Sequence, residues 1–106
     1  MSFQSGCWSQ TSGLRIRPVP ELKRCCVYVP APARLYWLDL NAWLSLELCD
    51  GSREDLIVLR YVHAVCPPLL PRQARSECRL TLARLAELGM VVRHDHDCSG
   101  DQCDVG

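Results

Sequence analysis

Residues 38–52 have the sequence Leu-Asp-Leu-Asn-Ala-Trp-Leu-Ser-Leu-Glu-Leu-Cys-Asp-Gly-Ser, and the rest of the chain is organised around this stretch. It predicts the end of a strand and then a helix over residues 40–49, with Asp39 or Asn41 as the N-cap. The leucines at positions 40, 44, 46 and 48 predict the inward side of that helix. Gly51 is expected at positive φ just beyond the helix. Ser52 is expected to cap a second helix.

The composition suits one small domain. The chain has 106 residues, of which 48% are hydrophobic, so a single modest core is expected. Basic and acidic residues number 12 each, so the net charge is zero. Residues 1–13 lack the features of a signal peptide, and no apolar run reaches the ~20 residues of a membrane helix. We therefore expect a cytoplasmic protein with no membrane partner.

The chain contains eight cysteines, which is many for a chain of this length. In the absence of a signal peptide, a disulfide framework is not expected. Cys49 and Cys78 fall among leucines on helix faces, where a free cysteine behaves as a small hydrophobic residue. Cys25 and Cys26 are neighbours in a strand-like run, so their side chains are expected on opposite faces.

Strands are expected in the first half of the chain, over residues 14–17, 25–29 and 34–38. The last two are expected to form a hairpin. Alternation places Tyr36 and Leu38 on one face and Leu35 and Trp37 on the other. Because both faces are apolar, we expect both to be covered.

Helices are expected in the second half, over residues 53–65 and 71–88, with Gly89 ending the last one. The inward set of the first is expected to be Leu59, Val62 and Val65, or Val58 and Val62. The inward stripe of the second comprises Ala74, Cys78, Leu82 and Leu85.

Because strands precede helices, the sequence predicts an α+β fold in the manner of a winged helix-turn-helix, with an N-terminal antiparallel hairpin or three-stranded sheet followed by three helices. Residues 1–13 are expected to be a flexible arm with Trp8 as its anchor, and residues 14–93 the folded domain. Residues 94–106 are expected to be an acidic tail that contains cysteine and histidine.

The order of these signals resembles the PqqD-like family, the peptide chaperones of pyrroloquinoline quinone biosynthesis. The resemblance covers about residues 14–93. It is carried by Leu38, Asp39, Ala42, Leu48, Cys49, Asp50 and Gly51, and then by Leu82, Leu85, Gly89, Met90 and Val91. The chain departs from the family at Glu54, where the family often has a threonine that caps the helix.

The resemblance implies a winged helix-turn-helix without catalysis or cofactor, which acts as a recognition element for ribosomally made precursor peptides. Such domains bind the leader of the precursor and present it to a tailoring enzyme, often a radical S-adenosylmethionine enzyme. The leader adds as a strand to the edge of the hairpin, beside the last helix. The peptide-binding residues implied here are Arg34, Leu35, Tyr36, Trp37 and Leu38 on the strand, and Arg75, Cys78, Arg79 and Leu82 on the helix. Self-pairing through the same edge would give a homodimer.

There are four alternatives to peptide binding. Leu35 and Trp37 can simply pack on the last helix and the arm. A winged-helix DNA-binding regulator would use the arginines of residues 71–88, but zero net charge and an acidic tail argue against a nucleic-acid partner. The zinc-type ligands His94, His96, Cys98 and Cys103 do not have a common finger spacing, so no metal site is expected. His63 has no evident partner for nucleophilic catalysis, so no enzyme activity is expected.

Overall fold

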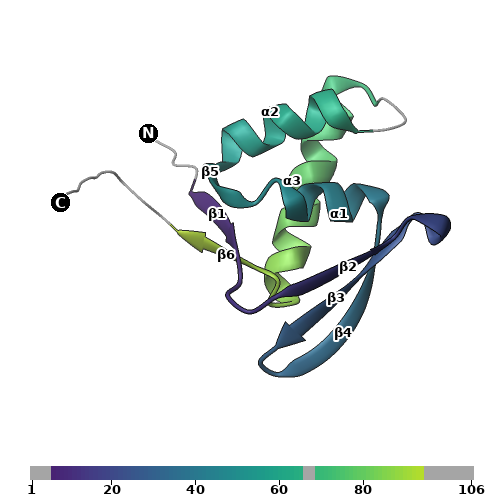
Figure 1. Cartoon of the computed structure of the whole chain (residues 1–106). Helices are drawn as coiled ribbons and strands as arrows, with labels where there is room; N and C mark the ends of the chain where they lie inside the picture. Colours follow the sequence, from purple (N-terminus) through teal and green to yellow (C-terminus); the bar gives the residue numbers. More distant parts are fainter. Residues whose placement is uncertain (1–5, 66–68, 95–106) are drawn as a thin grey trace.

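Two antiparallel three-stranded sheets and three α-helices make up the residues that the computed structural model describes, 6–65 and 69–94 (Figure 1). The first sheet has the order β2-β3-β4, with strands Arg15–Val19, Arg24–Pro30 and Ala33–Asp39. A short 3₁₀ helix, Pro20–Leu22, joins β2 to β3. The predicted α+β class, the hairpin and the third strand beside it are therefore confirmed.

The second sheet has the order β5-β1-β6, with strands Asp50–Arg53, Cys7–Gln10 and Val91–His94. The expectation of a flexible arm over residues 1–13 is wrong for β1, which pairs with both β5 and β6. The partners of β1 lie far along the chain, so nothing local in the sequence indicates the pairing. The fold also continues to His94, one residue into the expected tail.

Polar side chains of this N-terminal segment bond to the rest of the fold. The Trp8 indole donates to the Glu54 carboxylate at 3.0 Å, and Gln10 Nε2 donates to the Leu46 carbonyl at 3.0 Å. Trp8 and Gln10 therefore help to fix β1 in place.

The three helices are α1 (Leu40–Glu47), α2 (Glu54–Ala64) and α3 (Pro71–Glu87). The Asp39 carboxylate accepts a hydrogen bond from the Ala42 N–H at 2.9 Å, which confirms the predicted N-cap of α1. Gly51 has the expected positive φ, 97°, but it lies in β5 and not at a helix end.

The predicted capping of α2 by Ser52 is wrong. The Ser52 hydroxyl bonds to the Asp50 carboxylate, and Arg53 is the N-cap residue of α2, with no side-chain cap. Asp50 lies two residues before Ser52, so the local turn takes the hydroxyl that was expected to cap the helix.

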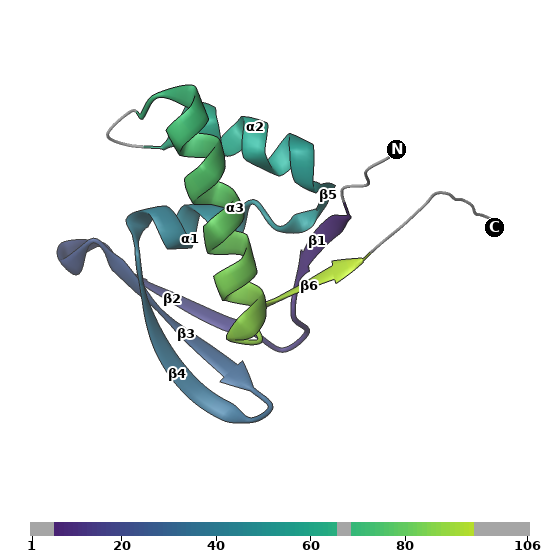
Figure 2. The ribbon, with the colours of Figure 1, turned by 180° about the vertical axis from the view of Figure 1, so that it is seen from behind.

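The core lies between the helices and the inner face of the first sheet. Cys25, Val27 and Val29 alternate inward from β3, and all three are buried. The predicted inward stripe of α3 is confirmed, because its four members are buried: Ala74, Cys78, Leu82 and Leu85. From behind, α3 runs along the molecule from α2 toward β6 (Figure 2).

The inward sides of α1 and α2 differ from the prediction. In α1, Ser45 and Leu46 are buried, while Leu40 is exposed. Helix α1 contacts α3 as well as β3 and β4, and the side of the helix that faces these elements is the buried side. In α2 the buried residues are Ile57, Val58 and Tyr61. Of the two inward sets expected, the one with Leu59 is wrong, because 54% of Leu59 is exposed. The other set agrees better, since Val58 is buried and Val62 is partly buried.

Candidate functional site

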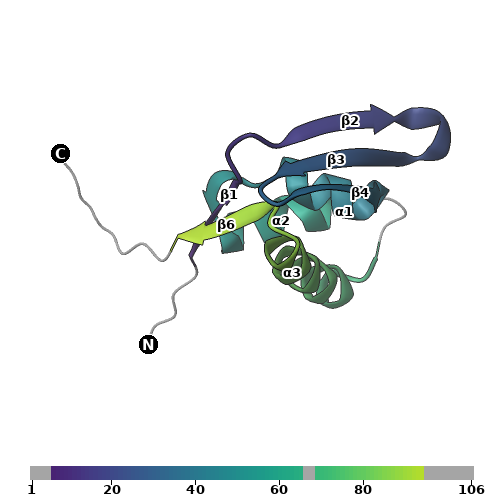
Figure 3. The ribbon, with the colours of Figure 1, turned by 90° about the horizontal axis from the view of Figure 1, so that it is seen from below.

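The outer edge of β4 is open. In the first sheet β3 is the central strand, and β4 pairs with β3 alone among the described strands. The backbone N–H and C=O groups that point away from β3 therefore have no strand partner within the described part of the chain. Such an edge can pair with an added strand. Seen from below, β2, β3 and β4 follow one another toward α3, and β4 lies nearest that helix (Figure 3).

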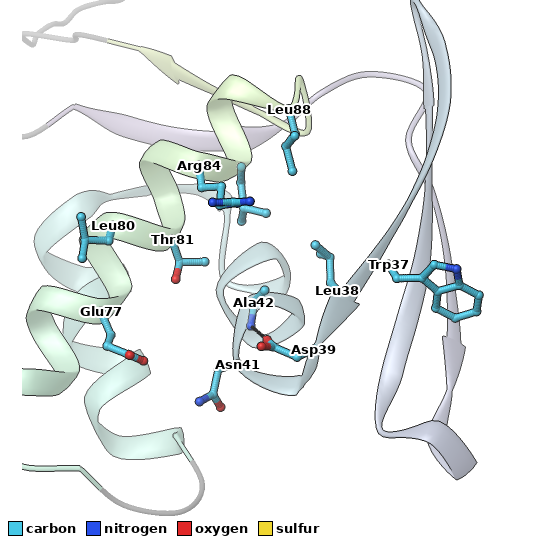
Figure 4. A pocket seen from close by; sticks show the side chains of 11 residues that line it. Trp37, Leu38, Asp39, Asn41, Ala42, Glu77, Leu80, Thr81, Arg84 and Leu88 are labelled. Carbon is cyan, nitrogen blue, oxygen red and sulfur yellow. Dashed lines mark hydrogen bonds between the residues drawn. The ribbon is translucent and has the colours of Figure 1, made fainter.

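A groove of about 460 Å³ lies between the end of β4, the first turn of α1 and one face of α3 (Figure 4). Its lining residues are Trp37, Leu38, Asp39, Asn41, Ala42, Glu77, Leu80, Thr81, Arg84, Leu85 and Leu88. The groove adjoins the open edge of β4 at its last three residues, Trp37, Leu38 and Asp39, so an extended segment that pairs with this end of the edge would enter it.

One face of α3 forms the far wall of the groove. Its lining residues recur at intervals of three and four positions, from Glu77 to Leu88, and therefore share one side of the helix. Leu85 belongs both to this wall and to the core. Leu80 is 70% exposed, which leaves an apolar side chain at the groove without a covering partner among the described residues.

The two ends of the groove differ in charge. Asp39, Asn41 and Glu77 lie toward one end, and Arg84 and Leu88 lie toward the other (Figure 4). The Asp39 carboxylate already accepts the Ala42 N–H through Oδ1, which holds it in place beside the groove. The groove therefore offers carboxylates at one end, a guanidinium toward the other and leucines between them.

The structure places the five strand residues of the predicted site along β4, with the expected alternation. Trp37 and Leu38 line the groove, and the Trp37 ring points away from α3 (Figure 4). Leu38 and Tyr36 face inward, whereas Leu35 and Trp37 are 67% and 54% exposed. Arg34 is exposed and lies nearer the hairpin turn, outside the groove lining.

The four helix residues of the predicted site do not line the groove. Cys78 and Leu82 are buried in the core, and Arg75 is exposed elsewhere on α3. Arg79 Nε donates to Glu54 Oε2 at 3.1 Å. The prediction placed the peptide-binding wall on the buried stripe of α3 and its neighbours. The residues of α3 that line the groove lie instead on the adjacent face of the helix.

Glu54 joins three elements. Its carboxylate accepts the Trp8 indole N–H from β1 through one oxygen and the Arg79 guanidinium from α3 through the other. It is also the first residue of α2. Glu54 therefore links the N-terminal strand β1 to α2 and α3, and Arg79 supplies the bond from α3. This is the position where the chain departs from the PqqD-like pattern.

The outer face of the first sheet combines apolar and cationic side chains. The register places Leu35 beside Tyr28 and Trp37 beside Cys26. On the other side of β3, Arg15 of β2 lies beside Tyr28, and Arg17 lies beside Cys26. We expected both faces of this strand to be covered, but Leu35 and Trp37 remain exposed in the described part of the chain. The face is therefore a second accessible surface, on the side of the sheet opposite the core.

No group of metal-ligating side chains occurs within residues 6–65 and 69–94. Of the zinc-type ligands considered, His94 lies at the end of β6 and is exposed. His96, Cys98 and Cys103 lie outside the described residues.

Three cysteines of the core are poor candidates for a nucleophile. Burial raises the pKa of Cys25 to about 11, of Cys49 to about 12 and of Cys78 to about 11. Each thiol is therefore protonated near neutral pH, and only a thiolate is a strong nucleophile.

A signal for the groove wall is present in the sequence. Leu80, Arg84 and Leu88 are spaced by four residues and lie off the stripe of Ala74, Cys78 and Leu82. Leucines at a second set of positions beside the core stripe of a helix indicate a second contact surface on that helix. This pattern, together with the edge position of β4, would have identified the groove.

Comparison of the chain with protein-family models, with curated proteins and with solved structures finds no match. Among the described residues, none of the helices has both the length and the apolar character needed to cross a bilayer.

Proposed function

We propose that this protein is a non-catalytic peptide chaperone of the PqqD-like kind. It binds the leader of a ribosomally synthesised precursor peptide as an added strand on β4 and presents it to a tailoring enzyme, of the radical S-adenosylmethionine class, in the cytoplasm. The observation that supports the proposal best is the open edge of β4 beside a groove walled by α3. We also infer a winged helix-turn-helix, in which α2 and α3 form the helical pair and β3 and β4 the wing.

The chemistry of the groove suits an extended peptide. Main-chain bonds to the β4 edge would supply affinity, and alternate side chains would contact the leucines of the α3 wall. Polar groups line the groove as well, which gives it a means to select sequence. When a peptide fills the groove, most of the outer face of the sheet, with Leu35 and Arg17, stays accessible to the tailoring enzyme.

Calorimetric titration with the leader peptide encoded nearest the gene of this protein tests the proposal. We expect micromolar or tighter binding, about −8 kcal/mol. Leu80→Glu places a charge at the groove and should weaken binding roughly tenfold, or about 1.4 kcal/mol. Leu59→Glu is the matched control, because Leu59 is also an exposed leucine on a helix but lies outside the groove. Equal affinity of both variants would overturn the groove assignment.

The strand geometry has its own test. In an added strand, alternate N–H groups of the peptide point toward β4 and away from it. Two versions of the leader, N-methylated at alternate sets of residues, should therefore differ in affinity, with one version losing binding. If both versions bind as well as the parent peptide, the leader does not add to β4 as a strand.

The alternative is a winged-helix DNA-binding regulator, which would need free cations on α3. Arg72 and Arg75 are exposed there, whereas Arg79 pairs with Glu54 and Arg84 lines the groove. Such a regulator would bind duplex DNA with a steep dependence on salt. Tight, salt-sensitive duplex binding without leader binding would favour this alternative over the chaperone.

A further inference from the structure

The two charged ends of the groove are separated along α3 by a known distance. Glu77 and Arg84 are seven residues apart on the same face, which corresponds to about 10 Å along the helix axis. Asp39 and Asn41 lie toward the Glu77 end (Figure 4). The charge of the groove therefore changes from negative to positive along its length. Each half of a bound segment would meet a different charge.

Arg84 is available to an anion in the groove. The three ion pairs among the described residues involve Arg53, Arg60 and Arg79, so no described carboxylate pairs with Arg84. A guanidinium pairs well with a carboxylate because its donors match the two oxygens. At the other end, Asp39 and Glu77 place two carboxylates on opposite walls, an arrangement that suits an ammonium or guanidinium group.

The sheet fixes the direction of an added strand. Every strand pair in the first sheet is antiparallel. β4 ends at Asp39, beside the acidic end of the groove. A strand that continues the antiparallel order therefore begins at the acidic end and proceeds toward Arg84. Its earlier residues meet Asp39 and Glu77, and its later residues meet Arg84.

The spacing follows from strand geometry. Successive residues of a strand rise about 3.4 Å, and side chains on one face recur every two residues. Residues on the face toward α3 that are two apart span about 7 Å, and those that are four apart span about 14 Å. The separation of about 10 Å along α3 lies between these values, so the flexible side chains of Glu77 and Arg84 can meet charges at either spacing. Leu80 and Leu85 lie between the charged ends, and a spacing of four leaves one apolar residue opposite them.

We propose that the groove selects extended peptides in which a basic residue precedes an acidic residue by four positions, with an apolar residue midway between them. This inference rests on the proposed peptide-binding function and specifies the leader that the groove accepts. Asp39, Glu77 and Arg84 are then the residues that determine specificity.

Two isomeric peptides with blocked ends test the charge order. One is Ser-Lys-Thr-Leu-Thr-Glu-Thr-Leu-Ser, and in the other the lysine and the glutamate exchange places. Binding to the full chain is measured by nuclear magnetic resonance titration, which detects affinities into the millimolar range. We expect the lysine-first peptide to bind at least about fivefold more tightly, because only this order places both charges beside opposite charges.

A double variant of the protein provides the matched control. Glu77→Lys combined with Arg84→Glu keeps the net charge and changes only exposed side chains. It should reverse the preference between the two peptides, whereas Glu87→Lys combined with Arg72→Glu, outside the groove lining, should leave the preference unchanged. Thermal unfolding of each variant verifies that the fold is intact.

The outcomes separate this inference from the proposed function. A lysine-first preference that the groove variant reverses supports both. Equal binding of the two isomers, or a glutamate-first preference, overturns the charge order while peptide binding in the groove stands. If neither isomer binds but the leader does, the peptide class is wrong and the chaperone function stands. If neither the isomers nor the leader bind, both proposals fail.

Discussion

At the scale of single residues, the Tyr61 hydroxyl is a buried polar group whose hydrogen-bonding capacity is not met by the described residues. The side chain is 0% exposed, and its Oη has no partner at normal hydrogen-bond geometry among the described residues, although the Glu77 carboxylate lies near enough to act on it. Burial, and then the nearby charge of Glu77, raise the pKa of Tyr61 to about 12. A buried hydroxyl without a partner destabilises a fold by about 1–3 kcal/mol, so its removal should not harm the protein.

We therefore expect Tyr61→Phe to leave the free energy of unfolding unchanged or to raise it by up to about 1 kcal/mol. Tyr61→Ala should lower it by roughly 3–5 kcal/mol, because the ring fills the core. Chemical denaturation of the three proteins measures both changes. A loss of more than about 1 kcal/mol in Tyr61→Phe would mean that the hydroxyl has a partner in solution.

The buried thiols predict how stability depends on pH. In the folded chain the pKa values of Cys25, Cys49 and Cys78 are raised from 9.0 to about 11, about 12 and about 11, chiefly by burial. The unfolded chain therefore releases these protons at lower pH than the folded chain does. The free energy of unfolding should be at its full value below about pH 9 and decline as the pH rises through the folded values.

Urea denaturation at about pH 8 and about pH 10 measures this decline. Cys49→Ala should make the decline shallower, because one raised thiol is removed, although the variant is less stable at both pH values. A free energy of unfolding that stays constant across this range would show that the thiols ionise equally in the folded and unfolded chains.

At the scale of elements, α3 has the most clearly marked end. Gly89 has φ of 82°, and the N–H of Met90 bonds to the Leu85 carbonyl while that of Gly89 bonds to the Ala86 carbonyl. These two bonds form a Schellman motif, which requires a left-handed residue. A Cβ at position 89 would lie 3.6 Å from Val29 Cγ1, an ordinary contact, so any penalty comes from the backbone.

Gly89→Ala should lower the free energy of unfolding by roughly 1–2 kcal/mol. Gly89→Asn should lower it less, since asparagine adopts the left-handed conformation more readily. Thermal or chemical denaturation ranks the three proteins. If alanine is tolerated as well as glycine, the end of α3 does not need the left-handed conformation.

The sequence predicted elements best where a periodic pattern was strong. The four inward residues of α3 and the alternation along β4 were correct, because one side of each element packs against the core. Strand β1 was missed because its partners, Asp50–Arg53 and Val91–His94, lie far away in sequence. The helix residues predicted to bind peptide do not line the groove, since only the three-dimensional packing decides which side of α3 turns toward β4.

At the scale of the whole molecule, two surfaces could mediate self-association of the protein. The outer face of the first sheet carries Arg15, Arg17 and Arg24, so two such faces would repel each other. The edge of β4 carries unpaired backbone groups, which are self-complementary in an antiparallel pair. If the protein self-associates, we therefore expect it to do so through β4, the edge that the leader would use.

This competition gives a prediction for sedimentation velocity. A dimer that forms as the protein concentration rises should dissociate when leader peptide is added in excess, because peptide and second copy need the same edge. Leu80→Glu should weaken peptide binding and so require more peptide for the same effect, whereas Leu59→Glu should behave as the parent protein. A dimer that persists at saturating peptide would have to use another surface. The edge of β4 would then remain free for the leader in every copy.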